Sequence, residues 1–207
     1  GFASVKGGCG ASTLACATAV ELAASDRQRG TALIDLDFSC SLTGFLTGVR
    51  SSYSLADAIL NCRRLDLDYW NALVSKGPEG IDVLPARIGS GPRGECDMDA
   101  LRQVLRFARQ QYGFVVMDLG TARQSFWLPF CDELDLVFLV TTVDVMALFR
   151  CVRTVRELEE GGVQKSALRV VANQVETSSA MNAVELEKAI GRRVEAVVAD
   201  DRNAIRR

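Results

Sequence analysis

Val5-Lys6-Gly7-Gly8-Cys9-Gly10-Ala11-Ser12-Thr13 is the stretch that decides the fold of this chain. It follows a short apolar run, Gly1–Val5, and opens a run with helical spacing, Ser12–Ala24. Glycines let a backbone approach an anion closely, and the amide groups at a helix N-terminus carry partial positive charge. The stretch therefore predicts a phosphate-binding loop between a strand and a helix. A plain tight turn and a dinucleotide site of the G-x-G-x-x-G type are the alternatives.

The loop differs from the ordinary P-loop, G-x-x-x-x-G-K-[ST]. Gly10 matches the second glycine of that motif, and Ser12 matches the hydroxyl that binds Mg²⁺. Val5 stands at the first glycine, and Ala11 replaces the lysine that contacts the β- and γ-phosphates. A hydrogen bond to a charged group contributes about 1.5–3 kcal/mol. Ala11 therefore predicts weaker phosphate binding and slower hydrolysis, without loss of binding.

Apolar, strand-like runs alternate with helical patterns along the rest of the chain. The strand-like runs lie at 31–36, 81–84, 114–117, 134–141, 168–172 and 194–198, and the helical patterns at 55–62, 67–74, 98–112, 145–158 and 183–190. Unbroken apolar strands between helices indicate a parallel sheet that is covered on both faces. The sequence therefore predicts an α/β fold, doubly wound, with a mostly parallel sheet and helices on both faces. The segment 89–95 is expected to be a surface loop.

Length and composition restrict the class of protein. The 207 residues suit one domain, and the net charge of −2 provides no overall attraction to nucleic acid or acidic lipid. The sequence has no apolar run long enough to span a membrane, which needs about 18 residues. The seven cysteines accompany no histidine, so the usual zinc spacings are absent, and we expect reduced, mostly buried thiols. Because the first strand begins at residue 1, we expect a single domain over 1–207 that is cut at both ends.

Two acidic motifs follow the loop along the chain. Asp35 and Asp37 end a strand-like run about twenty residues past the loop, where a Rossmann fold has the acid that binds ribose. Asp118 follows four apolar residues, and Gly120 comes two residues later, which is the pattern of a Walker B strand whose acid holds Mg²⁺. Either motif alone also fits solvated acids at a strand end. The order of loop, paired acids and Walker B strand favours a nucleotide site.

The loop resembles the deviant Walker A loop of the ParA/MinD superfamily of P-loop ATPases, in which an extra lysine precedes two glycines. The resemblance covers almost the whole chain. It implies a homodimer that encloses ATP and Mg²⁺, with Lys6 of each subunit reaching the phosphates of the other. The residues that the resemblance assigns to nucleotide binding are Lys6, Gly7, Gly8, Cys9, Gly10, Ala11, Ser12, Thr13 and Asn173.

The resemblance also implies roles for the acids. Ser12, Asp35 and Asp118 would organise Mg²⁺ and its waters. Asp37 and Lys6 would be catalytic, Asp37 by positioning or activating the attacking water and Lys6 by contacting the phosphates. Gly120 would lie where the second switch senses the γ-phosphate. The family uses an Asn at the end of a late strand to read adenine, and Asn173 matches it, although such residues are often turn formers. Asp200 and Asp201 either line the base pocket or are solvated.

Within the superfamily, the chain looks most similar to the TadZ/CpaE branch. The matching stretches are KGGCGAS (6–12), DLDFSCSLTGFLTG (35–48), SLADAI (54–59) and Asp118-Leu119. That branch places pilus and secretion machinery at cell poles and carries a receiver-like domain upstream. The resemblance therefore implies a cytoplasmic, dimerising switch with protein partners and slow hydrolysis of ATP to ADP and phosphate. A scaffold that holds ATP without hydrolysing it is the first alternative.

Other functions remain open at this point. A ParA-type partition ATPase binds DNA through basic surfaces, and two arginine trios have helical spacing: Arg150, Arg153 and Arg156, and Arg102, Arg106 and Arg109. Nearby acids favour solvated helix faces instead, so DNA is the less favoured partner. Phe126, Trp127 and Phe130 either bind a partner or cover the sheet. A nicotinamide-dependent dehydrogenase would lack a catalytic histidine, since the chain contains none.

Overall fold

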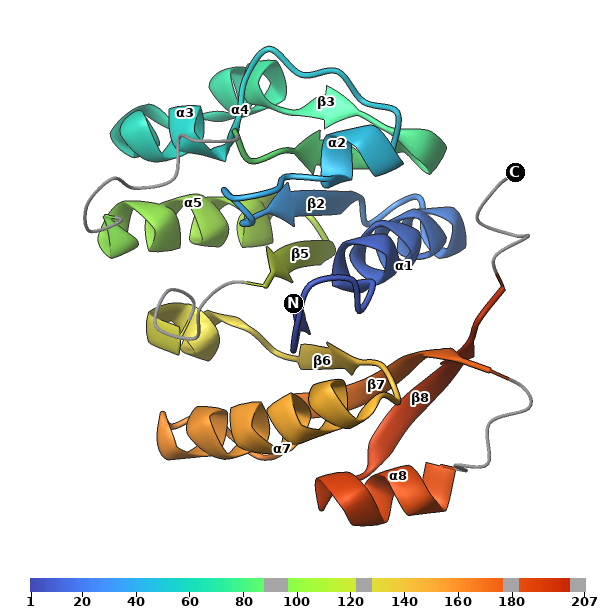
Figure 1. The fold of residues 1–207 in the computed structure, drawn as a ribbon. Helices are drawn as coiled ribbons and strands as arrows, with labels where there is room; N and C mark the ends of the chain where they lie inside the picture. Colours follow the sequence, from blue (N-terminus) through green and yellow to red (C-terminus); the bar gives the residue numbers. More distant parts are fainter. Residues whose placement is uncertain (88–96, 122–127, 177–182, 202–207) are drawn as a thin grey trace. The chain divides into compact units, whose positions relative to one another are not determined.

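The structure is a computed structural model, and it describes residues 1–87, 97–121, 128–176 and 183–201. The predicted surface loop at 89–95, Cys96, Phe126 and Trp127 lie outside these ranges. The chain divides into two compact units, each with strands and helices in alternation (Figure 1). Unit 1 comprises Gly1–Phe2 and Ser12–Ala122, and unit 2 comprises Ala3–Ala11 and Arg123–Arg207.

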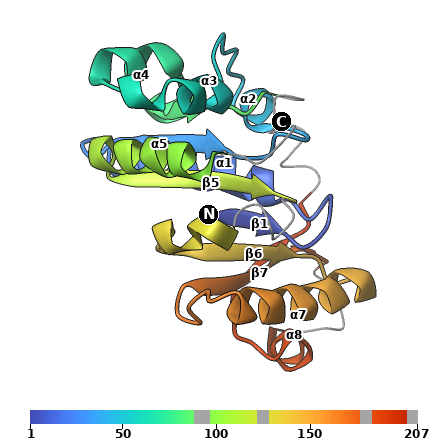
Figure 2. The same ribbon diagram turned by 90° about the vertical axis from the view of Figure 1, so that its left-hand side faces the viewer.

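Unit 1 has a sheet in which β2 (Thr31–Asp35) lies between β4 (Asp82–Leu84) and β5 (Phe114–Gly120), parallel to both. The short β3 (Ser75–Lys76) pairs with β4 in the antiparallel direction. All of β2 is buried, so both faces of this strand are covered, as its unbroken apolar run predicted. The α-helices of this unit are α1 (Ala11–Ser25), α2 (Thr43–Leu46), α3 (Leu55–Leu60), α4 (Leu67–Leu73) and α5 (Met98–Gln111), and α5 packs on β5 (Figure 2).

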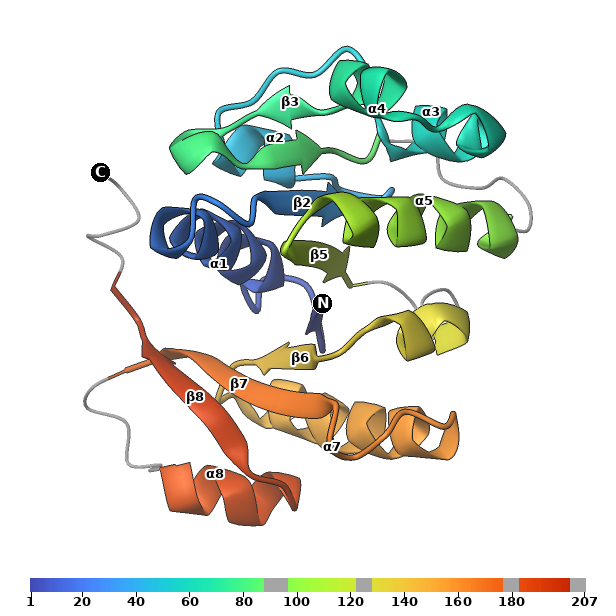
Figure 3. The same ribbon diagram turned by 180° about the vertical axis from the view of Figure 1, so that it is seen from behind.

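Unit 2 contains a second parallel arrangement, in which β7 (Leu168–Val175) pairs with β6 (Val137–Thr141) and β8 (Val194–Ala199). Helix α7 (Val145–Glu160) packs on β6, and α8 (Ala183–Ile190) packs on β8 and α7 (Figure 3). Directly after β1 (Phe2–Ser4), the Val5 amide donates to the Val140 carbonyl of β6 at 3.1 Å. This bond fixes the start of the glycine-rich loop.

The structure corrects several boundaries from the sequence. Strand β5 continues through Gly120, so Asp118 lies within the strand. Strand β7 continues to Val175, so Asn173 does not end it, and Asn173 is a strand residue and not a turn former. The short helix α2 and the two-residue strand β3 were missed, because neither is long enough to show a period. Phe130 is fully buried, which excludes it from an exposed partner-binding patch.

The described cysteines are all free thiols. Cys9, Cys16 and Cys151 are buried, as expected for small apolar side chains, whereas Cys40 is exposed. Within the same part of the chain, every helix is too short or too polar to cross a lipid bilayer.

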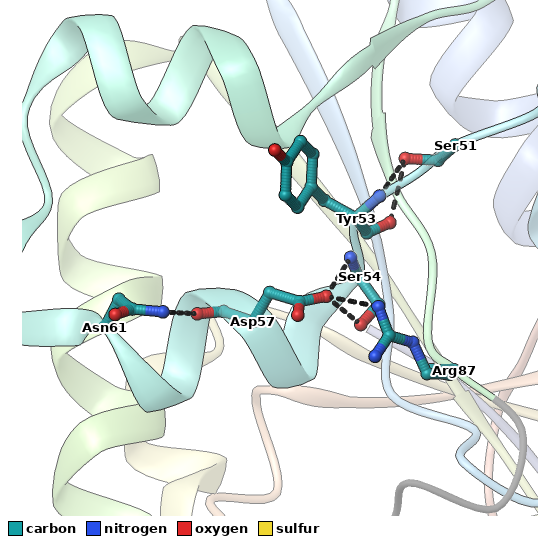
Figure 4. Close-up of polar contacts among 6 residues, drawn as sticks. All are labelled: Ser51, Tyr53, Ser54, Asp57, Asn61 and Arg87. Atoms are coloured by element: carbon teal, nitrogen blue, oxygen red, sulfur yellow. Dashed lines mark hydrogen bonds and ion pairs between the residues drawn. The ribbon is translucent and has the colours of Figure 1, made fainter.

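Helix α3 begins with a capping box that also fixes the chain after β4 (Figure 4). The carboxylate of Asp57 accepts hydrogen bonds from the Ser54 amide at 2.8 Å and the Ser54 hydroxyl at 2.7 Å. Arg87 donates to the same Asp57 oxygen at 2.9 Å. At the other end of the helix, the Asn61 side chain donates to the Asp57 carbonyl at 3.0 Å. The S-x-x-D pattern thus gives the helix its start.

A polar chain inside unit 1 links three elements. The Trp70 indole donates to the Tyr112 hydroxyl at 2.7 Å, and that hydroxyl donates to the Asp82 carboxylate at 2.8 Å. We expect Tyr112→Phe to lower the free energy of unfolding by about 1–3 kcal/mol, because it leaves the buried indole N–H without an acceptor. Urea unfolding measures the change. Tyr53→Phe, at an exposed tyrosine, is the control, and equal losses in the two variants would contradict the prediction.

Candidate functional site

The glycine-rich loop has the backbone conformation that its glycines predict. Gly8 and Gly10 have φ of +84° and +90°, in the left-handed region that disfavours other residues. The loop connects β1 to α1, which begins at Ala11. Ala11, at the position of the ordinary P-loop lysine, is 2% exposed. A buried alanine here means that the loop has no cation of its own at that position.

Lys6 forms an ion pair within unit 2. Its ammonium lies 3.1 Å from Oδ2 of Asp144, the residue that caps α7 by accepting a hydrogen bond from the Ala147 amide. The Thr142 hydroxyl donates to the same carboxylate at 2.6 Å. The hydrogen bond from Thr142, then that from the Ala147 amide, and then Lys6 lower the pKa of Asp144 to about 2. Lys6 is therefore oriented by a fixed carboxylate.

Two amide side chains of β7 contact the loop from within unit 2. Asn173 donates from Nδ2 to the Cys9 carbonyl at 2.8 Å, and Gln174 donates from Nε2 to the Gly8 carbonyl at 3.1 Å. Both acceptors are backbone atoms of the phosphate-binding loop. Asn173 was predicted as a base-reading residue, and here its amide nitrogen is engaged with the loop.

Asp35 and Asp118 lie directly opposite one another, because the register of β2 and β5 pairs them. Asp35 is fully buried, and burial raises the pKa of its carboxyl group. Its Oδ1 accepts from the Asp37 amide at 2.8 Å, and its Oδ2 accepts from the hydroxyls of Ser41 at 2.9 Å and Thr43 at 2.8 Å. Both oxygens are thus used to fix the segment that leads into α2. A role for Asp35 as a direct metal ligand would require these bonds to change.

Asp118 has one oxygen available. Its Oδ1 accepts from the Gly120 amide at 2.9 Å, whereas its Oδ2 is buried without a hydrogen-bond partner among the described residues. Burial raises the pKa of Asp118 to about 6, whereas the nearby Ser12 hydroxyl acts in the opposite direction. A buried carboxylate oxygen beside a serine hydroxyl is a suitable pair of oxygen ligands for Mg²⁺. The residues therefore fit the predicted metal, with Ser12 and Asp118 as its ligands.

The carboxylate of Asp37 lies between the backbone amides that follow it in the chain and Gly120. Its Oδ1 accepts from the amides of Ser39 at 2.9 Å and Cys40 at 3.1 Å. A Cβ atom at Gly120 would lie 2.4 Å from Asp37 Oδ2, and Gly120 has φ of +55°. Only glycine permits this approach. Gly120, two residues after the Walker B acid Asp118, therefore lies directly against the predicted catalytic carboxylate.

Sequence reasoning found the loop and the acids but missed the residues that orient them. Ser41 and Thr43 lie within the stretch 35–48, but no sequence motif marks their hydroxyls as functional. Asp144 shows a helix-cap pattern, since it precedes the apolar-periodic residues of α7. Gln174 gave no signal, because its role depends on an irregular strand. The arginines of α7 are exposed, and Arg153 pairs with Glu157 at 2.6 Å, as expected of a solvated helix face.

The raised pKa of Asp118 predicts a pH dependence of stability. Between about pH 4 and pH 6, the folded protein binds more protons than the unfolded chain, so its stability falls as the pH rises. We expect Asp118→Asn to raise the free energy of unfolding of the metal-free protein by about 2 kcal/mol at pH 7 and to change it little at pH 4. Urea unfolding with a chelator measures this, with exposed Asp68→Asn as control. A gain that is equal at both pH values would contradict the prediction.

Comparison with known proteins identifies the fold. No protein-family model and no curated protein sequence matches the chain. Among solved structures, a ParA family ATPase from Chlorobium tepidum TLS superposes with a TM-score of 0.87 at 23% identity, over 99% of this chain and 86% of that one.

Two MinD structures are also similar. The septum site-determining protein MinD with Mg-ADP from Pyrococcus horikoshii OT3 gives a TM-score of 0.72 at 17% identity, over 97% of this chain and 80% of that one. The MinC:MinD complex of Aquifex aeolicus gives 0.75 at 18% identity, over 99% and 82%. The chain therefore has the α/β fold of the ParA and MinD ATPases, and the strands in its described part are mostly parallel.

Proposed function

We propose that this chain is an ATP-dependent dimerising switch with slow ATP hydrolysis. The observation that carries the proposal is the buried Oδ2 of Asp118, which has no hydrogen-bond partner among the residues that the structure describes. It lies in the same unit as the Ser12 hydroxyl at the start of α1. An ionisable oxygen buried without a partner is costly, and Mg²⁺ would relieve this cost. The metal would bring the phosphates of ATP to the glycine-rich loop, which ends at Ser12.

The triphosphate would bind to the backbone of residues 7–13. Left-handed conformations at Gly8 and Gly10 favour successive amides that turn toward one anion, and the N-terminus of α1 adds its dipole. Gly7, Cys9, Ala11 and Thr13 would contribute through their backbone. Ala11 supplies no side-chain cation, so the affinity would be lower than that of an ordinary P-loop.

Lys6 would replace the missing cation across a dimer interface. In the single subunit it is paired with Asp144, and its side chain is 32% exposed. A partly exposed ion pair contributes little net stability, so exchanging Asp144 for a phosphate of the opposite subunit would cost little. ATP would then favour the dimer by mass action, because it binds best where both subunits contribute.

Asp37 would position the water that attacks the γ-phosphate, which makes the chain a weak ATPase. In the TadZ/CpaE-like role, the dimer would localise pilus or secretion machinery from the cytoplasm through protein partners. The loop KGGCGAS with its alanine, and the stretch at 35–48, support that branch. DNA partition is the less favoured alternative, because Arg153 on α7 is already paired with Glu157.

Sedimentation tests the dimer. We expect ATP with Mg²⁺ to double the mass of the wild type, whereas ADP and nucleotide-free samples remain monomeric. Lys6→Ala should bind ATP but stay monomeric, because it removes the cation that crosses the interface. Lys188→Ala, at an exposed lysine of α8, is the charge-matched control and should dimerise normally. An unchanged mass of the wild type with ATP would refute the switch.

Phosphate release tests hydrolysis. Asp37→Asn keeps an oxygen that accepts the Ser39 and Cys40 amides but loses the carboxylate charge. We expect it to slow phosphate release about 100-fold or more, as for loss of a catalytic base, and to leave ATP binding intact. Asp37→Ala should be equally slow. Background-level release by the wild type and both variants, with ATP still bound, would favour the scaffold over the enzyme.

A further inference from the structure

We propose that Asn173 and Gln174 act together as positioning residues for the phosphate-binding loop, so that both are needed to bind a phosphate chain whether or not it carries a base. This inference rests on the proposed triphosphate site and concerns how that site is shaped. It starts from two hydrogen bonds, from Asn173 Nδ2 to the Cys9 carbonyl at 2.8 Å and from Gln174 Nε2 to the Gly8 carbonyl at 3.1 Å.

A local irregularity in β7 makes the arrangement possible. Consecutive residues of a regular strand point to opposite faces, yet Asn173 and Gln174 both reach the loop. The pairing of β7 with β8 shifts register between Ala172 and Val175, and Gln174 has φ of +56°. Glu79 is the other non-glycine residue with positive φ in the described part of the chain. The strand thus adopts a disfavoured conformation at the residue whose side chain contacts Gly8.

The two bonds determine where the loop amides point. A peptide group is planar and trans, so its N–H points away from its C=O. Turning the Cys9 carbonyl toward Asn173 directs the Gly10 N–H to the opposite side, and turning the Gly8 carbonyl toward Gln174 does the same for the Cys9 N–H. These amides are ones that a P-loop offers to phosphate oxygens. Asn173 and Gln174 therefore orient the Cys9 and Gly10 amides by holding the carbonyl side of the same peptide groups.

Close packing fixes the contact further. A Cβ atom at Gly10 would lie 2.3 Å from Asn173 Nδ2, so this glycine is needed for the approach of the strand as well as for its own φ of +90°. Cys9 is fully buried, and Asn173 is 8% exposed. The amide nitrogen of Asn173 is thus enclosed and bonded to the loop, whereas Gln174 is exposed.

The two roles for Asn173 predict different ligand preferences. A base-reading residue would matter for ATP and not for a phosphate chain without a base. A loop-positioning residue would matter equally for ATP, GTP and inorganic tripolyphosphate, because all three present the same phosphates. The ratio of affinities separates the roles even when the absolute affinity falls.

Calorimetric titration of the full chain with Mg²⁺ and each of the three ligands provides the test. We expect Asn173→Leu, which is nearly isosteric and adds no charge, to weaken all three ligands by a similar factor of ten or more. Gln174→Gly should weaken binding of all three ligands by one common factor, smaller than that of Asn173→Leu. Because glycine tolerates the positive φ at this position, the thermal midpoint of the variant should not fall. Asn61→Leu is the matched control, because it removes an Asn–carbonyl bond at 3.0 Å from unit 1.

The outcomes distinguish the inference from the proposed function. If the wild type binds none of the three ligands, the triphosphate site itself is refuted, and the positioning role falls with it. If the wild type binds them and Asn173→Leu weakens ATP but leaves tripolyphosphate unchanged, the site stands and the positioning role is wrong. Equal weakening by Asn61→Leu would also refute it, since the effect would then not come from the loop.

Discussion

The register between β2 and β5 is the constraint on which the acidic half of the candidate site depends. It places Asp35 opposite Asp118 in a region without solvent exposure, where burial raises the pKa of both carboxyl groups and the charge of Asp35 raises that of Asp118 further. Two buried carboxylates this close together are stable only if each has its own hydrogen-bond partners or ligand. Asp35 is satisfied by the chain that follows it, through Asp37, Ser41 and Thr43. Asp118 is satisfied only in part among the described residues. This asymmetry is consistent with a structural role for Asp35 and with the ligand-binding role that we propose for Asp118.

Contacts of the two acids also connect the ends of β2 and β5 to the segment that leads into α2. Through Asp35, the segment leading into α2 depends on the carboxyl end of β2. Through Gly120, the end of β5 lies against Asp37. A change at Asp118 would therefore reach Asp37 by direct contact, since Gly120 also donates its amide to Asp118. Interiors are packed too densely for such a shift to be absorbed locally.

Much of this architecture was predictable from the sequence, for identifiable reasons. Long periodic segments such as α5 and α7 were placed within two or three residues, because their apolar stripes are clear. The loop and the three acids were found because each follows an apolar run. The extension of β7 to Val175 was not predictable, since it depends on Gln174 adopting a left-handed conformation that only tertiary contacts with the loop stabilise. Likewise, no local pattern shows which oxygen of Asp118 remains unpaired.

The ion pair between Lys6 and Asp144 has a consequence for the encounters of this chain with other anions. A cation on a glycine-rich loop would attract any polyanion nearby, including nucleic acid and acidic lipid. Asp144, fixed at the start of α7, neutralises that charge at short range. Proteins often discriminate between partners by making an unfavourable interaction with the incorrect one. The charge of Lys6 is thus neutralised locally, and other anions must first compete with a carboxylate that is already in position.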